Sequence, residues 1–255
     1  MKIASWNVNS LRVRLPHVLD WLESAQPDVL GLQETKTVDS EFPVEAIEEA
    51  GYRVIYSGQK TYNGVALLSR TQLSDVVTDL PDLDDHQRRI LVASVGGIRI
   101  INLYVPNGES VDSEKYQYKL DWLEKVSAYI KQQLVAHPRL IVMGDFNIAP
   151  EDRDVYDPQE WAGHVLCSEP ERAAFRRLLD LGLHDTFRLF EQPDRSYSWW
   201  DYRMMAFRRK RGLRIDHVLA SKVLADRCTE ANIDIEPRKR ERPSDHAPVI
   251  ATFQR

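Results

Sequence analysis

The chain has 255 residues, of which 43% are hydrophobic and 9% aromatic, with a net charge of -5 and a mean hydropathy of -0.44. This balance excludes disordered and fibrous classes, and the length suits one large domain covering residues 1–255. No run of about 18 apolar residues and no apolar leader is present, so we expect neither a membrane span nor secretion. Two cysteines, Cys167 and Cys228, are typical of a reducing compartment, so we expect a cytoplasmic protein, by default a monomer.

Apolar or alternating segments that end in turn residues predict strands, and apolar residues three or four apart predict helices. In chain order, the pattern predicts a strand at 2–8, a helix at 15–24, buried strands at 29–33, 54–57, 64–69, 90–94 and 98–104, a helix at 116–136, a strand at 140–143, a helix at 169–181, and strands at 215–220 and after residue 246. Some strands follow each other directly, whereas helices separate others. This mixture favours mixed sheets with helices outside over a purely parallel fold.

Basic residues are concentrated late in the chain. Residues 1–171 carry 16 Lys and Arg against 27 Asp and Glu, whereas residues 172–242 carry 17 against 11. The densest run, 203–214, has six cations and no acid, and it follows the aromatic segment 197–202. Phosphate contacts beside a stacking surface have this composition, and so does a solvated charged loop. Both interpretations stay open at this point.

Polar side chains stand at the ends of the predicted strands, where α/β enzymes place their chemistry. Each one alone has an explanation as a turn or cap residue. The set consists of Asn7, Asn9, Glu34, Tyr104, Asp145, Asn147, Asp216, Asp245 and His246. Because strand ends of one domain can converge, the set as a whole predicts one polar site.

A converged cluster of carboxylates and amides suits a hard cation such as Mg²⁺, with Mn²⁺ as a possible substitute. The sequence has no HExxH motif and no cysteine pair at metal spacing, which disfavours zinc. It also has no Walker A loop, no GxGxxG after a strand and no GxSxG elbow. The chemistry that remains is metal-assisted attack on a phosphate ester.

A series of motifs between residues 5 and 249 resembles the exonuclease III family, the bacterial AP endonuclease group of the endonuclease/exonuclease/phosphatase superfamily. The motifs are SWNVNSLR, GLQETK, GQKTYNGVALLSR, QRRI, MGDFNIAP, WWDYR, RGLRIDHVLAS and RPSDHAPV. The resemblance implies a four-layer α/β sandwich, with two packed mixed β-sheets flanked by helices. It also implies an Mg²⁺-dependent DNA repair phosphodiesterase, which incises 5' to abasic sites, removes 3'-phosphates and other 3' blocks, and degrades double-stranded DNA from 3' to 5' by in-line attack of water.

The resemblance also assigns metal ligands. Glu34 matches the principal ligand, with Asn7 beside it and Asp245 supporting the metal region. The full set that it implies is Asn7, Glu34, Asp145, Asn147, Asp245 and His246.

The same resemblance assigns catalytic roles to five residues. Asp145 positions or deprotonates the attacking water, and Asn147 holds that geometry and the phosphate. His246 hydrogen-bonds the scissile phosphate, with Asp216 as its orienting carboxylate. Tyr104 lies near the phosphate, where it stabilises the transition state or orients the nucleophile.

DNA contacts are expected from three places. Trp199 matches the tryptophan that lines the pocket for the extruded abasic sugar. Asn107 stands where the family commonly has glutamine, so its DNA contact is expected to be shorter. From the basic run, Arg208, Arg209 and Arg211 are expected to contact phosphates. Lys115 and Lys119 either contact phosphates or lie on a solvated helix face.

Two alternatives remain from the sequence. The first is a phosphodiesterase of the same superfamily that acts on a non-DNA phosphate ester, which would need no groove contacts. The second is a noncatalytic nucleic-acid-binding regulator, which would not need the full set of carboxylates. The complete acidic set disfavours the regulator, and the aromatic and basic segment disfavours the non-DNA substrate.

Overall fold

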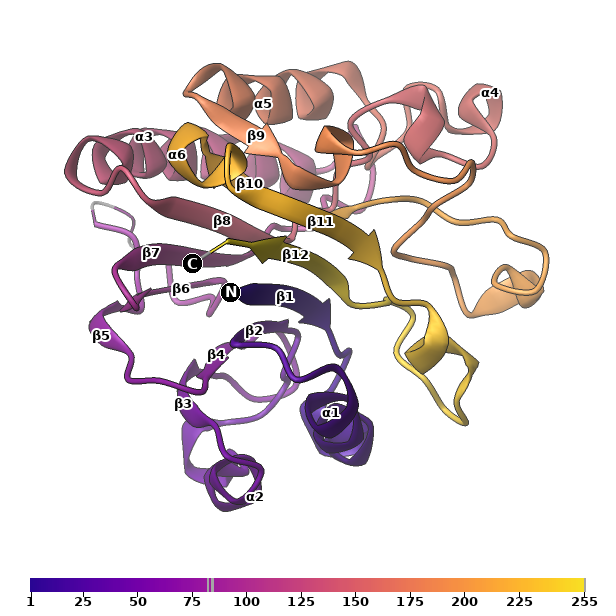
Figure 1. The fold of residues 1–255 in the computed structure, drawn as a ribbon. Helices are drawn as coiled ribbons and strands as arrows, with labels where there is room; N and C mark the ends of the chain where they lie inside the picture. The colour runs from indigo at the N-terminus through magenta and orange to yellow at the C-terminus, as the bar shows by residue number, and fades with distance from the viewer. Residues whose placement is uncertain (82, 84, 255) are drawn as a thin grey trace.

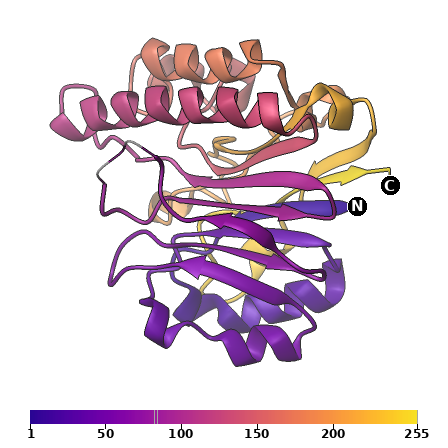
Figure 2. The ribbon, with the colours of Figure 1, turned by 90° about the vertical axis from the view of Figure 1, so that its left-hand side faces the viewer.

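The computed structural model describes residues 1–81, 83 and 85–254. Over that part of the chain two six-stranded sheets pack against each other, and helices cover the outer face of each (Figure 1). Figure 2 shows the same arrangement from the side, with helices above and below the sheets. The prediction of a four-layer α/β sandwich with two mixed sheets is therefore confirmed.

The first sheet has the strand order β11-β12-β1-β2-β4-β3. Its strands are β1 (Lys2–Asn7), β2 (Val29–Gln33), β3 (Arg53–Ser57), β4 (Val65–Ser69), β11 (Cys228–Ile233) and β12 (Val249–Phe253). Strands β1 and β2 run parallel, and the other neighbours are antiparallel. Strand β3 was predicted to be buried, and this was wrong for most of its length, because it is an edge strand with a neighbour on one side only.

The second sheet has the strand order β5-β6-β7-β8-β10-β9. Its strands are β5 (Ser74–Val77), β6 (Ile90–Val95), β7 (Ile98–Tyr104), β8 (Leu140–Asp145), β9 (Leu183–Asp185) and β10 (Asp216–Ser221). Only β7 and β8 are parallel neighbours among these pairs. Each sheet therefore has one parallel pair at its centre, and the site described below forms where these pairs end.

The longer helices form the outer layers. Helices α1 (Leu11–Ala25) and α2 (Val44–Glu49) cover the first sheet, and α3 (Glu114–Ala136) and α5 (Glu169–Asp180) cover the second (Figure 1). Helices α4 (Pro158–Trp161) and α6 (Lys222–Ala225) are single turns. Short 3-10 segments lie at Asp39–Glu41, Asp152–Asp154, Thr186–Leu189, Arg203–Met205 and Glu236–Lys239. No helix in the described ranges is long and apolar enough to cross a membrane.

Alternate residues of the central strands face different layers, as the two-residue period of a strand requires. On β2, Leu30 and Leu32 pack in the core beneath α1, whereas Val29 packs between the two sheets. All five residues of β2 are buried for this reason. Polar side chains of such strands can reach solvent only at the strand ends, which concentrates them at the edge of the sandwich.

Several elements carried too little pattern to be predicted. Strand β9 has three residues and β5 is largely exposed, so neither shows the apolar alternation of a buried strand. The helix predicted at 15–24 begins earlier, at Leu11. Helix α3 begins close to its prediction because Ser113 caps it, its hydroxyl accepting a hydrogen bond from the backbone N–H of Tyr116 at 3.1 Å.

Candidate active site

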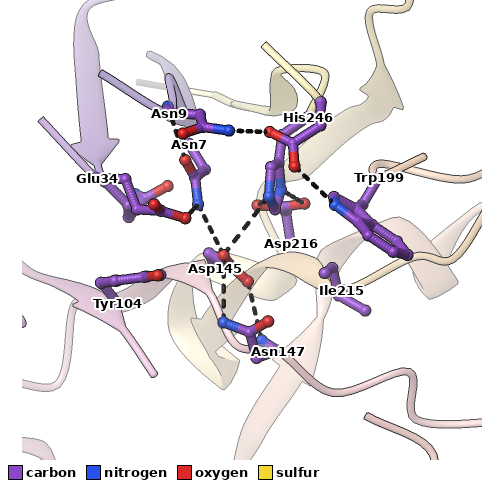
Figure 3. A network of polar contacts seen from close by, with 12 residues as sticks. Asn7, Asn9, Glu34, Tyr104, Asp145, Asn147, Trp199, Ile215, Asp216 and His246 are labelled. Atoms are coloured by element: carbon purple, nitrogen blue, oxygen red, sulfur yellow. Dashed lines mark hydrogen bonds and ion pairs between the residues drawn. The ribbon is translucent and has the colours of Figure 1, made fainter. Parts of the chain in front are cut away.

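Strand pairing brings the predicted polar residues to one edge of the sandwich. In the second sheet, Asp145 at the end of β8 lies opposite Tyr104 on β7 and opposite Asp216 on β10. In the first sheet, Asn7 ends β1, and Glu34 directly follows β2. Figure 3 shows the side chains from both sheets turned toward one another.

The amide of Asn7 connects the two sheets at the centre of this edge. Its Nδ2 donates to Glu34 Oε1 and to Asp145 Oδ2, both at 2.8 Å. Glu34 has a φ of 50°, in the left-handed region, which turns its side chain back toward β1. Its other carboxylate oxygen lies 2.9 Å from Lys36 Nζ.

Three side chains form a group with the spacing of a metal site. One carboxylate oxygen each from Glu34 and Asp145 and one ring nitrogen of His246 all lie within 4.8 Å of one another. The two carboxylates supply the oxygen donors that a hard divalent cation prefers. The donor set therefore fits Mg²⁺, and the Asn7 amide already places its hydrogen atoms against the same two carboxylates.

The imidazole of His246 lies between two carboxylates, those of Asp216 and Asp145. Its Nδ1 lies 2.9 Å and 3.1 Å from the two oxygens of Asp216, and its Nε2 lies 3.8 Å from Asp145 Oδ2. The hydroxyl of Ser198 in turn donates a hydrogen bond to Asp216 Oδ2 at 2.6 Å. The same hydroxyl accepts hydrogen bonds from the backbone N–H groups of Ile215 and Asp216. Nothing in the sequence pattern indicated Ser198, because its contacts come from a residue 18 positions away.

Burial and charge shift both buried titratable groups at the centre of the site. Burial raises the pKa of Asp145 to about 7, and the positive charge of His246 opposes that rise. Burial alone would lower the pKa of His246, but the carboxylates of Asp216, Asp145 and Asp245 outweigh it and raise that pKa to about 10. A pKa of about 10 keeps the imidazole positively charged near neutral pH.

Asn147 lies directly against Asp145. Its backbone N–H donates to Asp145 Oδ1 at 2.9 Å, and its Nδ2 donates to the carbonyl of Val105 at 2.9 Å. Asn107 reaches the same side chain, with 3.3 Å between its Nδ2 and Asn147 Oδ1. Asn147 has a φ of 49°. The structure thus brings Asn107 and Asn147 together beside Asp145.

Asp245 lies beside the three-residue group and is not a member of it. One carboxylate oxygen accepts a hydrogen bond from Asn9 Nδ2 at 2.9 Å, and the other accepts one from Trp199 Nε1 at 3.0 Å. This places the predicted pocket tryptophan at the rim of the site (Figure 3). Asn9, which the sequence singled out without a role, connects Asp245 to Lys36, whose Nζ donates to Asn9 Oδ1 at 2.6 Å.

Tyr104 forms the opposite rim. Burial raises the pKa of its phenol well above the usual value, and the nearby carboxylates of Glu34 and Asp145 raise it further. The guanidinium of Arg89 lies 4.8 Å from the centre of the Tyr104 ring and donates to its carbonyl at 3.2 Å. Arg89 belongs to the motif QRRI, but no role was assigned to it from the sequence.

A cleft of about 640 Å³ opens beside this rim. Tyr104 and Asn107 line it together with Arg89, Lys115 and amide side chains such as Gln59 and Gln87. Lys115 is exposed and close to solvent, as the sequence allowed. Lys119 is different: both predicted interpretations, a phosphate contact and a solvated face, were wrong, because its side chain is fully buried in an ion pair with Glu171.

Residues 203–211 of the basic run lie in a largely exposed loop outside the catalytic cluster, whereas Arg214, the last cation of the run, is buried in ion pairs with Asp154 and Asp185. Arg208 and Arg209 are exposed, and the guanidinium of Arg211 lies 5.7 Å from the centre of the Tyr156 ring. Phe207 anchors the loop by packing edge-on against the buried ring of Trp200, with 5.1 Å between ring centres. The structure therefore places these arginines on the surface and not among the groups that surround Asp145.

The sequence profile of the Endonuclease/Exonuclease/phosphatase family matches residues 4–246, and the chain belongs to that family. Along its full length it is 41% identical to the full length of exodeoxyribonuclease III from Haemophilus influenzae. It is also 31% identical to the exodeoxyribonuclease of Bacillus subtilis, over 98% of each chain. The resemblance drawn from the motifs is thereby confirmed.

Solved structures agree with this placement. The 3'-5' exonuclease NExo from Neisseria meningitidis is 48% identical and superposes with a TM-score of 0.98, over the whole of both chains. A Neisseria NExo variant described as a 3' phosphatase bound to product DNA hairpin gives the same values. An AP endonuclease from Archaeoglobus fulgidus is 40% identical, with a TM-score of 0.96 over the whole of both chains.

Proposed function

We propose that this chain is an Mg²⁺-dependent DNA repair phosphodiesterase of the exonuclease III type. Its substrates are double-stranded DNA with abasic sites, which it incises on the 5' side, and DNA 3' ends, from which it removes phosphates, blocking groups and nucleotides. The observation that carries this proposal is the convergence of Glu34, Asp145 and His246 from separate strand ends into one group within 4.8 Å. Relatives named exodeoxyribonuclease, 3' phosphatase and AP endonuclease support it.

Glu34 and Asp145 would hold the cation through their carboxylates, with Asn7 beside them and Asn147 and Asp245 in supporting positions. A bound Mg²⁺, or Mn²⁺ in its place, would neutralise charge on the phosphate and on the leaving oxygen. Lys36 and Asn7 already offset part of the negative charge on Glu34.

Asp145 accepts the proton of the attacking water. A pKa of about 7 suits a group that must take up a proton near neutral pH. The backbone and side chain of Asn147 hold the Asp145 carboxylate in one orientation, since they donate to both of its oxygens. Water then attacks phosphorus in line with the leaving oxygen, and no covalent intermediate with the protein forms.

His246 donates a hydrogen bond from Nε2 to the scissile phosphate. Asp216 fixes the ring by holding Nδ1, so that Nε2 faces Asp145 and the position of the reacting phosphate. Tyr104, whose raised pKa keeps its phenol protonated, donates to the phosphate from the opposite rim.

Trp199 closes the sugar pocket, and DNA contacts outside it come from Asn107 and from Arg208, Arg209 and Arg211. Because the basic arginines lie on an exposed loop, they can contact phosphates without altering the catalytic cluster. We propose further that the protein acts as a monomer in the cytoplasm. Its two cysteines, Cys167 and Cys228, are free thiols, which is consistent with a reducing compartment.

The test uses three labelled duplexes that carry an internal abasic analogue, a 3'-phosphate end or an undamaged recessed 3' end. Wild-type protein is expected to process them with Mg²⁺ and not with EDTA. Glu34→Gln should lower kcat/KM by at least about 100-fold, since it removes a carboxylate from the cation site. Glu41→Gln, at an exposed residue, is the matched control and should behave as wild type.

The relative rates on the three duplexes would show which activity this chain favours. Failure to cleave any duplex, with cleavage of a small phosphodiester instead, would replace the proposal by a phosphodiesterase of non-DNA esters. Equal rates for Glu34→Gln and Glu41→Gln would contradict the assigned site.

A further inference from the structure

Helix α3 carries a buried charge that the proposed reaction does not use. The side chains of Lys119 on α3 and Glu171 on α5 have no exposed surface and form an ion pair with each other. Burial lowers the pKa of Lys119, and the charge of Glu171 opposes that decrease. Since two buried charges are costly to desolvate, their retention here calls for a specific role.

The ammonium group of Lys119 has three N–H donors, and each has a partner. One partner is the Glu171 carboxylate, and the other two are backbone carbonyl oxygens, that of Asn147 at 2.7 Å and that of Asn107 at 3.0 Å. These carbonyls belong to the loops that follow β8 and β7. Lys119 therefore holds, from behind, the two loops whose side chains meet beside Asp145.

Glu171 connects a third loop to the same point. Its Oε1 accepts the backbone N–H of Leu166 at 3.0 Å, and its Oε2 accepts the backbone N–H of Ser168 at 3.1 Å and the Ser168 hydroxyl. The Ser168 hydroxyl also lies 2.6 Å from the hydroxyl of Tyr116 on α3. Three loops at the site edge thus share one ion pair.

The Asn147 residue is held at both of its backbone polar groups. It has a φ of 49°, in the left-handed region, which Asn adopts more readily than most residues other than glycine. The Asn147 N–H is held by Asp145 and its carbonyl by Lys119. The Lys119 side chain also packs closely against the Asn107 loop. A Cβ added at Gly108 would lie 3.2 Å from Lys119 Cδ.

We propose that Lys119 is a positioning residue for the reaction, which fixes the Asn147 and Asn107 loops against Asp145 through two hydrogen bonds to their carbonyl oxygens. This inference rests on the proposed function. A pair that served only to pack α3 against α5 would do as well with apolar side chains of similar volume. An apolar side chain, however, cannot donate to both loops at once.

The test compares Lys119→Met with Lys125→Met, which makes the same change at an exposed position of α3. Both are assayed on the 3'-phosphate duplex at saturating DNA, well below the unfolding temperature. Lys119→Met is expected to lower kcat about 10-fold to 100-fold, the effect of a misplaced catalytic group. In an Asn147→Ala background it should lower kcat by a smaller factor than in the wild type, because the Asn147 side chain, one of the groups that it positions, is gone.

A kcat for Lys119→Met within about 2-fold of Lys125→Met would overturn the inference, as would single losses that multiply in the double variant. If Lys119→Met does not fold, the combined Lys119→Met and Glu171→Gln variant removes both charges together and is assayed in the same way. Absence of cleavage by the wild type would be a different failure, since it removes the proposed function before any variants are compared.

Discussion

Two clusters of buried charge lie on opposite sides of the start of strand β10. Asp216 faces the active site and holds His246. The next residue, His217, faces the helical layer, where its ring packs against Phe146 and Phe175. Its Nε2 contacts the carbonyl of Ile148 at 2.9 Å, and its Nδ1 contacts the guanidinium of Arg214 at 3.1 Å. The chain thus buries a histidine on each side of one strand.

The pKa values of the two histidines are shifted in opposite directions because the charge around them differs. Burial and Arg214 lower the pKa of His217 to about 4. The carboxylates in that cluster, Asp154 and Asp185, are both paired with Arg214, so they have little negative charge left to offer His217. Around His246 no arginine in the described ranges balances the acids, and the pKa rises to about 10.

The balance of charge distinguishes the active-site cluster around His246 from the structural cluster around Arg214. In the Arg214 cluster the charges of the protein satisfy one another, so the cluster can stabilise the fold but has no capacity for a ligand. In the active-site cluster the carboxylates of Glu34, Asp145 and Asp216 exceed the cations supplied by the chain. A divalent cation can compensate this surplus of negative charge.

The largest expected effect is a contrast between one aspartate from each cluster, Asp216 and Asp185. Asp216→Asn should lower kcat by about 10²–10⁴-fold, because His246 loses its orienting charge. Asp185→Asn should instead lower the free energy of unfolding by about 3 kcal/mol, because it breaks a buried ion pair, while kcat stays within about 2-fold. Steady-state kinetics and urea unfolding of both variants measure this contrast. Equal losses of kcat in Asp216→Asn and Asp185→Asn would contradict the division into a catalytic and a structural cluster.

A smaller effect is expected from the acid titration of His217. Its folded-state pKa of about 4 lies below the unfolded value of about 6.5, so the unfolded chain binds the proton more tightly. The stability from a neutral His217 is therefore present above pH 6.5 and is lost as the pH falls toward 4. Between pH 7 and pH 5 this contributes a loss of about 2 kcal/mol.

Urea unfolding of the wild type and of His217→Gln at both pH values measures this loss. Glutamine keeps a neutral polar group at the position, so the variant should lose about 2 kcal/mol less than the wild type between pH 7 and pH 5. His86→Gln, at an exposed histidine, should follow the wild type. Identical pH dependence in wild type and His217→Gln would mean that His217 is not the group that titrates.

Much of the fold could be predicted from the sequence, and so could the residues that meet at the candidate site. The strands that carry the site are largely apolar segments, and their polar site residues stand at or directly after the strand ends, as with Asp145 at the end of β8. The Arg214 cluster and the burial of Lys119 could not be predicted. Lys119 meets Glu171 across 52 positions, and Arg214 meets Asp154 across 60, and no local pattern marks such partners. Lys119 differs from the exposed Lys125 only by its place on the helix.

The smallest expected effect concerns the basic loop, 203–212, where surplus charge of the opposite sign lies on the surface. Replacing Arg208, Arg209 and Arg211 together with alanine should reduce the slope of log affinity for duplex DNA against log salt by up to about 3, since each phosphate contact contributes about 0.9. At saturating DNA kcat should change little, because none of the three contacts the catalytic cluster in the described part of the chain.

A matched control removes the same charge from three other exposed positions, Arg53, Arg177 and Arg227. Binding isotherms between about 50 and 200 mM salt measure both slopes. If the loop variant keeps the wild-type slope, its arginines do not contact DNA, and the surface excess of positive charge there has no part in binding.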